Sequence, residues 1–270
     1  MPNTKYLVDY HTHTSLCKHA DGTAEAYVQQ AIGLGLTEIG CSDHSPMPDF
    51  YDPEHRMTLE EFESIYKPMV SELKTRYKEN ITVRFGVEAD YYPGTEDFVR
   101  ALVNENAFDF VIGSIHFLDD WGFDNPRYIH RYDQQDVDEI YERYFQTVKQ
   151  AAASGLFDIL GHIDLVKKFG HRPTKSMKEI LWETFKVIKE NDLAVEINTA
   201  GLRKPVREIY PSVEILEIIK DLQIPLSLGS DAHAPDDVAR DFDLAIELVR
   251  KYGNSMIALF ERRERRLVRI

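Results

Sequence analysis

Short runs of β-branched and aromatic residues alternate with longer amphipathic segments along almost the whole chain, and this alternation restricts the fold more than any other feature. The apolar runs predict seven strands, at residues 5–11, 36–44, 81–90, 108–116, 157–164, 193–201 and 224–233. Segments with the three- and four-residue apolar spacing of helices lie between them, among others at 23–35, 59–80, 134–155 and 176–191. Such alternation indicates an α/β fold with a parallel sheet covered by crossover helices. Closed into a ring, the sheet becomes a TIM-like barrel with seven strands.

The chain shows no sign of division into separate parts. No Ser/Gly-rich linker or internal repeat interrupts the 270 residues, so we expect a single domain over residues 1–270. Two connecting segments, 45–58 and 117–133, are longer than most loops, and both follow strands at the same end of the barrel. They are either lids and substrate-recognition segments or simple surface excursions. The basic C-terminal segment 261–270 is predicted to form a solvated helix end.

Charge and cysteine content exclude some classes of partner and compartment. The formal net charge of −14 argues against a nucleic-acid partner, because that role requires an excess of Lys and Arg. Cys17 and Cys41 are too few for a disulfide-built fold, which favours a reducing cytoplasm. No leader-like start and no apolar stretch of the ~20 residues needed to cross a bilayer are present, so we expect no membrane partner. The sequence leaves the oligomeric state open.

Polar side chains cluster at the predicted strand ends. In a β/α barrel the carboxyl ends of all strands meet at one mouth, where the active sites of this architecture lie. The pairs His11/His13 and Asp231/His233 each place two side chains on the same side of a strand, because residues two apart point the same way. The strand-end residues are His11, His13, Asp43, His44, Glu88, His116, His162, Asp164, Asn198, Asp231 and His233.

This set predicts a metal site. Imidazole together with carboxylate suits zinc, iron or manganese, whereas calcium and magnesium sites rarely use imidazole. A lone histidine is more often a packed or surface residue, but here most of the histidines lie at or near the ends of predicted strands. His55, His130 and His171 do not, and we expect them to be surface or loop residues, with a lid contact to substrate as the alternative. The candidate donors exceed what one ion can use, so at least two metals follow: His11, His13, His19, His44, Glu88, His116, His162, Asp231 and His233.

At this point the residues resemble a known family. The fragments "HTH", "SDH", "GVEAD", "GSIH", "GHID" and "SDAH", in this order over residues 6–233, are similar to the polymerase-and-histidinol-phosphatase (PHP) family of metal-dependent phosphoesterases. The segments "CSDHSPMP" and "EINTAGLRKPVREIYPS" look most like the monofunctional histidinol-phosphate phosphatases of histidine biosynthesis. The resemblance implies a distorted (β/α)7 barrel, three divalent metal ions and a small phosphate monoester, L-histidinol phosphate, as substrate.

The resemblance also implies a ligand set for each ion. One ion would be held by His11, His13, Glu88 and Asp231. A second would share Glu88 as a bridge and add His116 and His162. The third would be held by His19, His44 and His233. No ligand of the family pattern is missing, which favours an active enzyme.

Other roles follow from the chemistry of phosphate-ester hydrolysis. A water that bridges two metals can lose a proton near neutral pH and attack in line, so no nucleophilic Ser or Cys is required. Arg203 is the first candidate for a phosphate clamp, because a guanidinium can contact two phosphoryl oxygens; Lys167 and Lys168 are second candidates, with an ordinary solvated charge as the alternative. Asp43 and Asp164 either orient ligand imidazoles or pass a proton to the leaving group.

Residues of the segment 117–133 are the candidates for substrate recognition. Asp119, Asp120 and Trp121 are candidates for contacts to the amino-imidazole part of the substrate, or for a lid that only excludes water. Three other functions stay open: a PHP phosphoesterase for a nucleotide, sugar phosphate or phosphotyrosine, an amidohydrolase, and a metal-binding module without activity. Amidohydrolases also carry His-x-His after the first strand, but Glu88 and the Asp-x-His at 231–233 fit them poorly.

Overall fold

The computed structural model describes residues 6–270 and contains a parallel sheet of seven strands in the order β1-β2-β3-β4-β7-β8-β9. All seven predicted strands are present, although each is shorter than predicted, and residue 5 of the first predicted strand lies outside the described residues. Their bounds are Val8–Asp9 (β1), Glu38–Cys41 (β2), Thr82–Asp90 (β3), Phe110–Ser114 (β4), Ile159–Leu160 (β7), Ala194–Asn198 (β8) and Leu226–Gly229 (β9).

The first and last strands of this sheet meet, so the sheet nearly closes on itself. The backbone N–H of Tyr10 donates to the carbonyl of Leu228 at 3.0 Å, and that of His13 donates to the carbonyl of Ala232 at 2.9 Å. The predicted TIM-like (β/α)7 barrel is therefore confirmed. Whether residues 1–270 form one domain stays a prediction.

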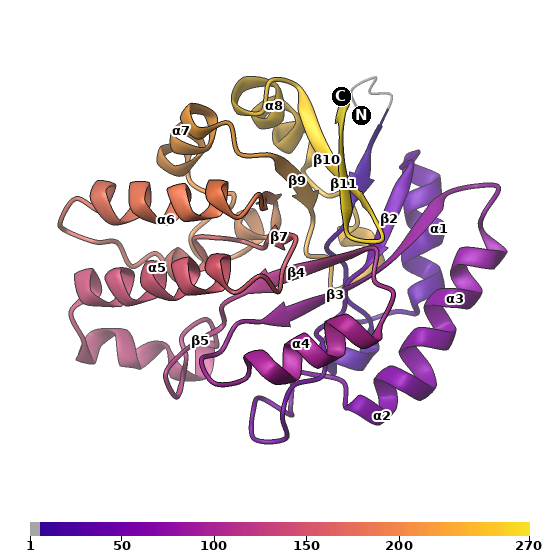
Figure 1. The fold of residues 1–270 in the computed structure, drawn as a ribbon, viewed down its shortest axis with the longest axis horizontal. Coiled ribbons are helices and arrows are strands. Elements are labelled where there is room, and N and C mark those ends of the chain that lie inside the picture. Colours follow the sequence, from indigo (N-terminus) through magenta and orange to yellow (C-terminus); the bar gives the residue numbers. More distant parts are fainter. Residues whose placement is uncertain (1–5) are drawn as a thin grey trace.

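Helices surround the strands (Figure 1). Thr23 caps the first of them by accepting a hydrogen bond from the N–H of Ala26, and Gly35 ends it in the left-handed conformation at φ 77°. The predicted helix at 59–80 is present as three consecutive pieces: α2 (Leu59–Glu61), the π-helical turn η2 (Phe62–Tyr66) and α3 (Lys67–Arg76). The other helices are α1 (Ala24–Leu34), α4 (Glu96–Glu105), α5 (Val137–Ala153), α6 (Lys178–Glu190), α7 (Val213–Leu222) and α8 (Phe242–Tyr252).

The loops that follow the strands contain short 3₁₀ turns and one small hairpin. The hairpin, formed by β5 (Phe117–Leu118) and β6 (Trp121–Gly122), orders the first part of the long predicted loop 117–133. The rest of that loop is mostly the turn η3 (Pro126–Gln134). The other turns are η1 (Ser15–Cys17), η4 (Leu165–Lys167), η5 (Ala200–Arg203) and η6 (Pro235–Asp237).

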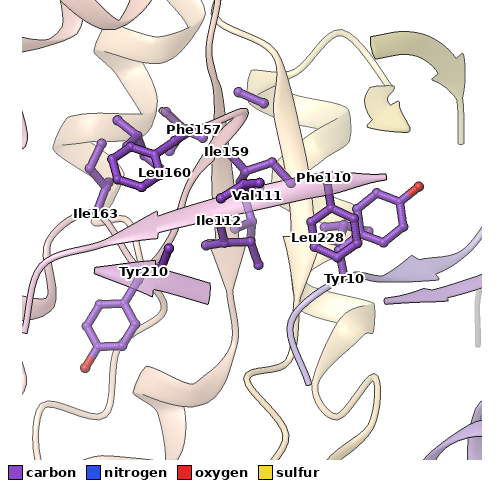
Figure 2. Close-up of a cluster of buried hydrophobic side chains, with 14 of the residues drawn as sticks. Tyr10, Phe110, Val111, Ile112, Phe157, Ile159, Leu160, Ile163, Tyr210 and Leu228 are labelled. Atoms are coloured by element: carbon purple, nitrogen blue, oxygen red, sulfur yellow. The ribbon is translucent and has the colours of Figure 1, made fainter. Parts of the chain in front are cut away.

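Aromatic and branched side chains fill the barrel interior (Figure 2). Phe110 stacks on Tyr10 with ring centroids 4.8 Å apart. Neighbouring strands leave room for this ring with glycines, because a Cβ at Gly40 or Gly86 would lie 2.6 or 2.5 Å from Cζ of Phe110. This packing fills the barrel, so functional groups remain accessible only at its ends.

The C-terminal segment differs from the prediction. Residues 261–270 do not form a helix end: they continue β10 (Met256–Glu261) into the antiparallel strand β11 (Glu264–Arg269). The physical reason is that the arginines of this hairpin find acidic partners on the barrel. Arg263 Nε lies 2.9 Å from Asp158 Oδ2, and Arg266 Nη2 lies 3.1 Å from Glu38 Oε1.

The two cysteines and the lengths of the helices bear on the disulfide and membrane expectations. Cys17 and Cys41 are both buried and unpaired, as expected for small packed side chains. Over residues 6–270, no helix has the length and apolarity that a membrane span requires.

Candidate metal centre

Glu88 is the centre of the predicted site. It lies in β3, is 1 % exposed, and both of its carboxylate oxygens face imidazoles that come from other strands. Oε2 lies 2.9 Å from Nδ1 of His44 and 3.4 Å from Nε2 of His11. Oε1 lies 3.0 Å from Nε2 of His162 and 3.7 Å from Nε2 of His116. One carboxylate thus faces ligand candidates on two sides, as a bridging ligand must.

Asp231 provides the second carboxylate of the cluster. Its Oδ1 lies 3.2 Å from Nε2 of His13 and 3.9 Å from Nε2 of His11. Asp231 adopts a left-handed backbone at φ 51°, two residues after the end of β9. The ligand atoms of His11, His13 and Asp231 all lie within 4.8 Å of one another, and so do those of His11, Glu88 and His162.

The third predicted ligand group lies beside the first two. Nε2 of His19 and Nε2 of His233 are 3.0 Å apart, and the His44 ring lies 5.5 Å from the His19 ring. His44 also contacts Glu88, and its nitrogen lies within 4.8 Å of those of His13 and His233. The structure therefore brings all nine predicted donors into one cluster, while the division of these donors among three ions stays a prediction.

In the cluster, burial and the neighbouring charges shift the pKa of several side chains in opposite directions. Burial alone would raise the pKa of Glu88 and of Asp231, but the surrounding imidazoles outweigh burial and hold both pKa values well below the ordinary range. Burial lowers the pKa of His44 to about 3. Burial also acts against charge on His13 and His116, yet the facing carboxylates raise the pKa of each to about 9. The carboxylates are thus ionised and attract cations.

Several donor atoms of the cluster have no hydrogen-bond partner within the described residues, which fits a site for a divalent metal. Nε2 of His11, Nε2 of His13 and Oε2 of Glu88 are buried and have no hydrogen-bond partner within residues 6–270. Buried polar atoms without partners are costly, and a cation between them would satisfy all three. Nitrogen and carboxylate donors in this arrangement suit zinc, manganese or iron.

Three further carboxylates contact ligand imidazoles from the side away from the cluster. Glu196 Oε1 lies 2.7 Å from Nδ1 of His11, and Asp90 Oδ1 lies 2.9 Å from Nδ1 of His116. Asp43 Oδ1 lies 3.6 Å from Nδ1 of His13, beyond hydrogen-bond distance, so the orienting role of Asp43 stays a prediction. The sequence reasoning missed Glu196 and Asp90. A signal was present, because each is an acidic residue within a strand segment that carries apolar residues on either side, "AVEIN" and "GVEAD".

Asp164 has a different environment from Asp43. It is 3 % exposed, its Oδ2 accepts a hydrogen bond from the N–H of Ser212 at 2.8 Å, and it pairs with Lys167 Nζ at 2.8 Å. These partners hold the loop after β7. They give no support to proton transfer by Asp164 at the metal cluster.

A cavity of about 460 Å³ opens over the cluster. Both long loops contribute to its wall, and an ion pair of 3.3 Å between Glu54 and Arg127 links them. His55, expected to be a surface residue, lines the cavity and has its Nδ1 2.7 Å from Asp52 Oδ1. Besides the metal candidates, the lining side chains are Asp52, His55, Arg56, Phe117, Asp124, Asn125, Pro126, Arg127, Leu165, Lys168, Lys204 and Tyr210, with Gly122.

Two lysines bring positive charge to this cavity. Lys168, predicted as a phosphate contact, lines the cavity and pairs with Asp124 at 2.9 Å. Lys204, which the sequence reasoning missed, also lines the cavity, and burial lowers its pKa. The sequence favours its neighbour Arg203 as the phosphate clamp, because a guanidinium can contact two phosphoryl oxygens.

The structure does not place three other predicted substrate residues in the cavity wall. Arg203 donates from Nη2 to the carbonyl of Ser230 at 2.7 Å. Lys167 is 1 % exposed and donates to the carbonyl of Ile209 at 2.8 Å. Trp121 is 1 % exposed and its indole packs against the ring of Tyr132 at 4.7 Å, so its substrate contact stays a prediction without support from the cavity wall.

The acidic residues beside Trp121 do not line the main cavity either. Asp119 and Asp120 line a second cavity beside α5 and pair with Arg143 and Arg131. His171, expected at the surface, stacks on Tyr132 at 4.2 Å, away from the metal cluster. Besides the metal candidates Glu88 and Asp231, the acidic groups that line the main cavity are Asp52 and Asp124.

Comparison with known proteins adds evidence that is independent of this geometry. Residues 9–200 match the family described as "PHP domain". A probable histidinol-phosphatase of Deinococcus radiodurans is 40% identical over 257 residues, covering 95% of this chain and 98% of the relative. A histidinol-phosphatase of Bacillus subtilis is 30% identical, covering 88% of this chain and 98% of the relative.

Solved structures show the same fold. The putative histidinol phosphatase of Listeria monocytogenes superimposes with a TM-score of 0.78 at 26% identity, covering 88% of this chain and 99% of that one. The histidinol phosphate phosphatase of Lactococcus lactis, complexed with Zn, L-histidinol and phosphate, gives a TM-score of 0.80 at 24% identity, covering 96% of this chain and 98% of that one.

Proposed function

Because this chain belongs to the PHP domain family, we propose that it is a metal-dependent phosphomonoesterase that hydrolyses L-histidinol phosphate to L-histidinol and phosphate. The observation that carries the proposal is the position of Glu88, whose two oxygens face imidazoles from several strands at the floor of a cavity. Relatives with that activity cover nearly the whole chain, and this decides against the amidohydrolase alternative.

The metal content is proposed as three divalent ions, drawn from zinc, manganese and iron. The first would be held by His11, His13, Glu88 and Asp231, the second by Glu88, His116 and His162, and the third by His19, His44 and His233. The short distances within each group support this division. When bound, such ions supply an acidified water as the nucleophile and positive charge for the phosphoryl oxygens.

The residues of the chain bind and orient the ester. Lys168 and Lys204 are placed to attract the phosphate, because both are cationic and line the same wall. Asp52 and Asp124 are placed to attract the ammonium group that histidinol carries at neutral pH. Charges of both signs in one cavity suit a substrate with an anionic and a cationic end. We retain Asp43 as the group that orients His13, rather than as a proton donor.

A phosphate-release assay tests the proposal. The protein is loaded separately with Zn²⁺, Mn²⁺ and Fe²⁺, its metal content is measured by elemental analysis, and histidinol phosphate is compared with nucleotide, sugar and tyrosine phosphates. We expect the highest kcat/KM for histidinol phosphate and a total loss of turnover after chelation. Preference for another ester would contradict the substrate, and full turnover without metal would contradict the mechanism.

The cellular compartment and the absence of a nucleic-acid partner are also proposals. Cys17 and Cys41 are unpaired, which supports a reducing cytoplasm as the compartment. The net charge of −14 supports the absence of a nucleic-acid partner.

A further inference from the structure

We propose that Glu196 is a positioning residue that fixes two metal ligands, His11 and His162, which belong to different ions of the proposed centre. The inference rests on the proposed function, because it concerns ions that the function requires. Glu196 lies in β8, is 1 % exposed, and is not one of the nine candidate donors.

The first oxygen of Glu196 sets the state of one imidazole. Oε1 lies 2.7 Å from Nδ1 of His11, so Nδ1 carries the proton and donates it to the carboxylate. The other nitrogen, Nε2, is buried without a hydrogen-bond partner in the described chain and lies 3.4 Å from Glu88. Glu196 therefore presents His11 to an ion through Nε2 and raises the basicity of that nitrogen.

The second oxygen holds the backbone of the other ligand. Oε2 accepts a hydrogen bond from the backbone N–H of His162 at 2.8 Å and another from Nδ2 of Asn198 at 3.0 Å. His162 has φ 20°, a backbone conformation that residues with a side chain rarely adopt. The hydrogen bond that the N–H of His162 donates to Glu196 stabilises this conformation, in which Nε2 of His162 lies 3.0 Å from Glu88 Oε1.

Neighbouring strands leave space for this carboxylate and nothing larger. A Cβ at Gly229, in β9, would lie 1.8 Å from Oε1 of Glu196. A Cβ at Gly161, just after β7, would lie 3.4 Å from Oε2. The carboxylate therefore occupies space that a side chain at Gly229 would need, and the backbone of Gly161 lies near its other oxygen.

The contacts distinguish Glu196 from the other buried carboxylates. Asp90 contacts a single ligand imidazole, that of His116. Glu38, in β2, is also buried, but its partners are the hydroxyl of Tyr10 at 2.7 Å, Nε of Arg84 at 2.8 Å and Nη2 of Arg266 at 3.1 Å, none of them a metal candidate. Glu38 therefore provides a matched control for the loss of one buried negative charge.

The experiment compares Glu196→Gln with Glu38→Gln in the full chain loaded with Zn²⁺. A chelator is added in excess, and the release of each ion is followed with a colorimetric zinc indicator. In Glu196→Gln the amide offers a single acceptor oxygen for donors that the carboxylate accepts at both ends, so we expect two of the three ions to leave at least about tenfold faster than in the wild type. The third ion, away from His11 and His162, should leave at the wild-type rate.

Further results separate positioning from simple structural damage. Glu38→Gln should lower the melting temperature while all three ions leave at wild-type rates. Excess Zn²⁺ should restore most of the activity of Glu196→Gln. If this variant does not fold, Glu196→Asp takes its place, because the shorter side chain cannot reach both partners at once.

Each outcome decides between the hypotheses. Wild-type release rates for all ions in a folded Glu196 variant would overturn the inference, and so would equal acceleration of all three ions. A wild-type protein that binds no ions would instead overturn the proposed function.

Discussion

Asp90 accepts a hydrogen bond from Nδ1 of His116 at 2.9 Å, and its other oxygen lies 2.7 Å from Nη2 of Arg56. Arg56 belongs to the loop 45–58 and lines the cavity. The hydroxyl of Tyr51, from the same loop, also donates to Asp90. A loop that forms the substrate cavity is thus joined to a candidate metal ligand through one buried carboxylate.

Replacement of Asp90 by Asn should weaken the hold on the ion that His116 ligates. The neutral amide is a poorer acceptor for the imidazole and leaves the buried Arg56 without its ion-pair partner. We expect kcat and affinity for that ion to fall by about 10- to 100-fold. Elemental analysis after dialysis, alongside steady-state kinetics, measures both quantities. Full retention of metal together with wild-type kcat would contradict the orienting role of Asp90.

The pH dependence of metal binding follows from the imidazoles of the metal-free protein. Burial lowers the pKa of His13 and of His116, but contacts with Asp231 and Asp43, and with Asp90 and Glu88, raise each pKa to about 9. Free histidine titrates near 6.5, so the metal-free fold gains stability from these charges fully below about pH 6.5 and loses it as the pH rises through 9. A metal ion requires neutral imidazoles and competes with these protons.

Two opposite trends are therefore expected between pH 6.5 and 9. The free energy of unfolding of the metal-free protein should fall, whereas the affinity for Zn²⁺ should rise, and binding at pH 7.5 should release protons. Calorimetric titration in two buffers of different ionisation enthalpy counts the protons, and urea unfolding across the pH series measures stability. Metal binding without proton release would show that these imidazoles are neutral before the ion arrives.

The strand pattern and the order of the polar motifs were enough to predict the barrel and its cluster of nine donors, because strand ends must meet at one mouth. Residues whose role depends on the direction of a side chain were not predictable in this way. Arg203 and Lys204 are adjacent in sequence, yet only Lys204 lines the cavity, since Arg203 turns to the carbonyl of Ser230. Likewise, the sequence pattern does not show that Trp121 packs inward against Tyr132.

The C-terminal hairpin was mispredicted for a related reason. The charges of residues 261–270 suggest a solvated helix when only local sequence is considered. Their partners, such as Asp158 for Arg263 and Glu38 for Arg266, are distant in the chain and become visible only in the folded barrel. Glu196 was missed because its function depends on His11, 185 residues away in sequence.

Lys204 and Arg203 make different predictions for phosphate binding. Lys204→Met should raise KM for histidinol phosphate about tenfold with little change in metal content, because Lys204 faces the cavity. Arg203→Met should raise KM less and lower metal retention, because Arg203 holds the carbonyl of Ser230, next to Asp231. Steady-state kinetics with parallel elemental analysis compares the two. The reverse order of KM effects would restore Arg203 as the phosphate clamp predicted from sequence.

Gly229→Ala should disturb the metal centre without removing any polar group. The new Cβ would lie 1.8 Å from Oε1 of Glu196 and 2.6 Å from Cβ of His11, so the carboxylate and the ligand must both move. We expect a loss of about 1–3 kcal/mol in the free energy of unfolding from overpacking, and faster zinc release.

Gly33→Ala is the matched control: a Cβ there has nothing within 4 Å, and Gly33 lies in helix α1. Since alanine favours a helix over glycine, the control should gain about 0.5–1 kcal/mol and release zinc at the wild-type rate. Urea unfolding and the chelator assay measure both variants, and a Gly229→Ala protein as stable and as retentive as the wild type would show that Glu196 has room to move.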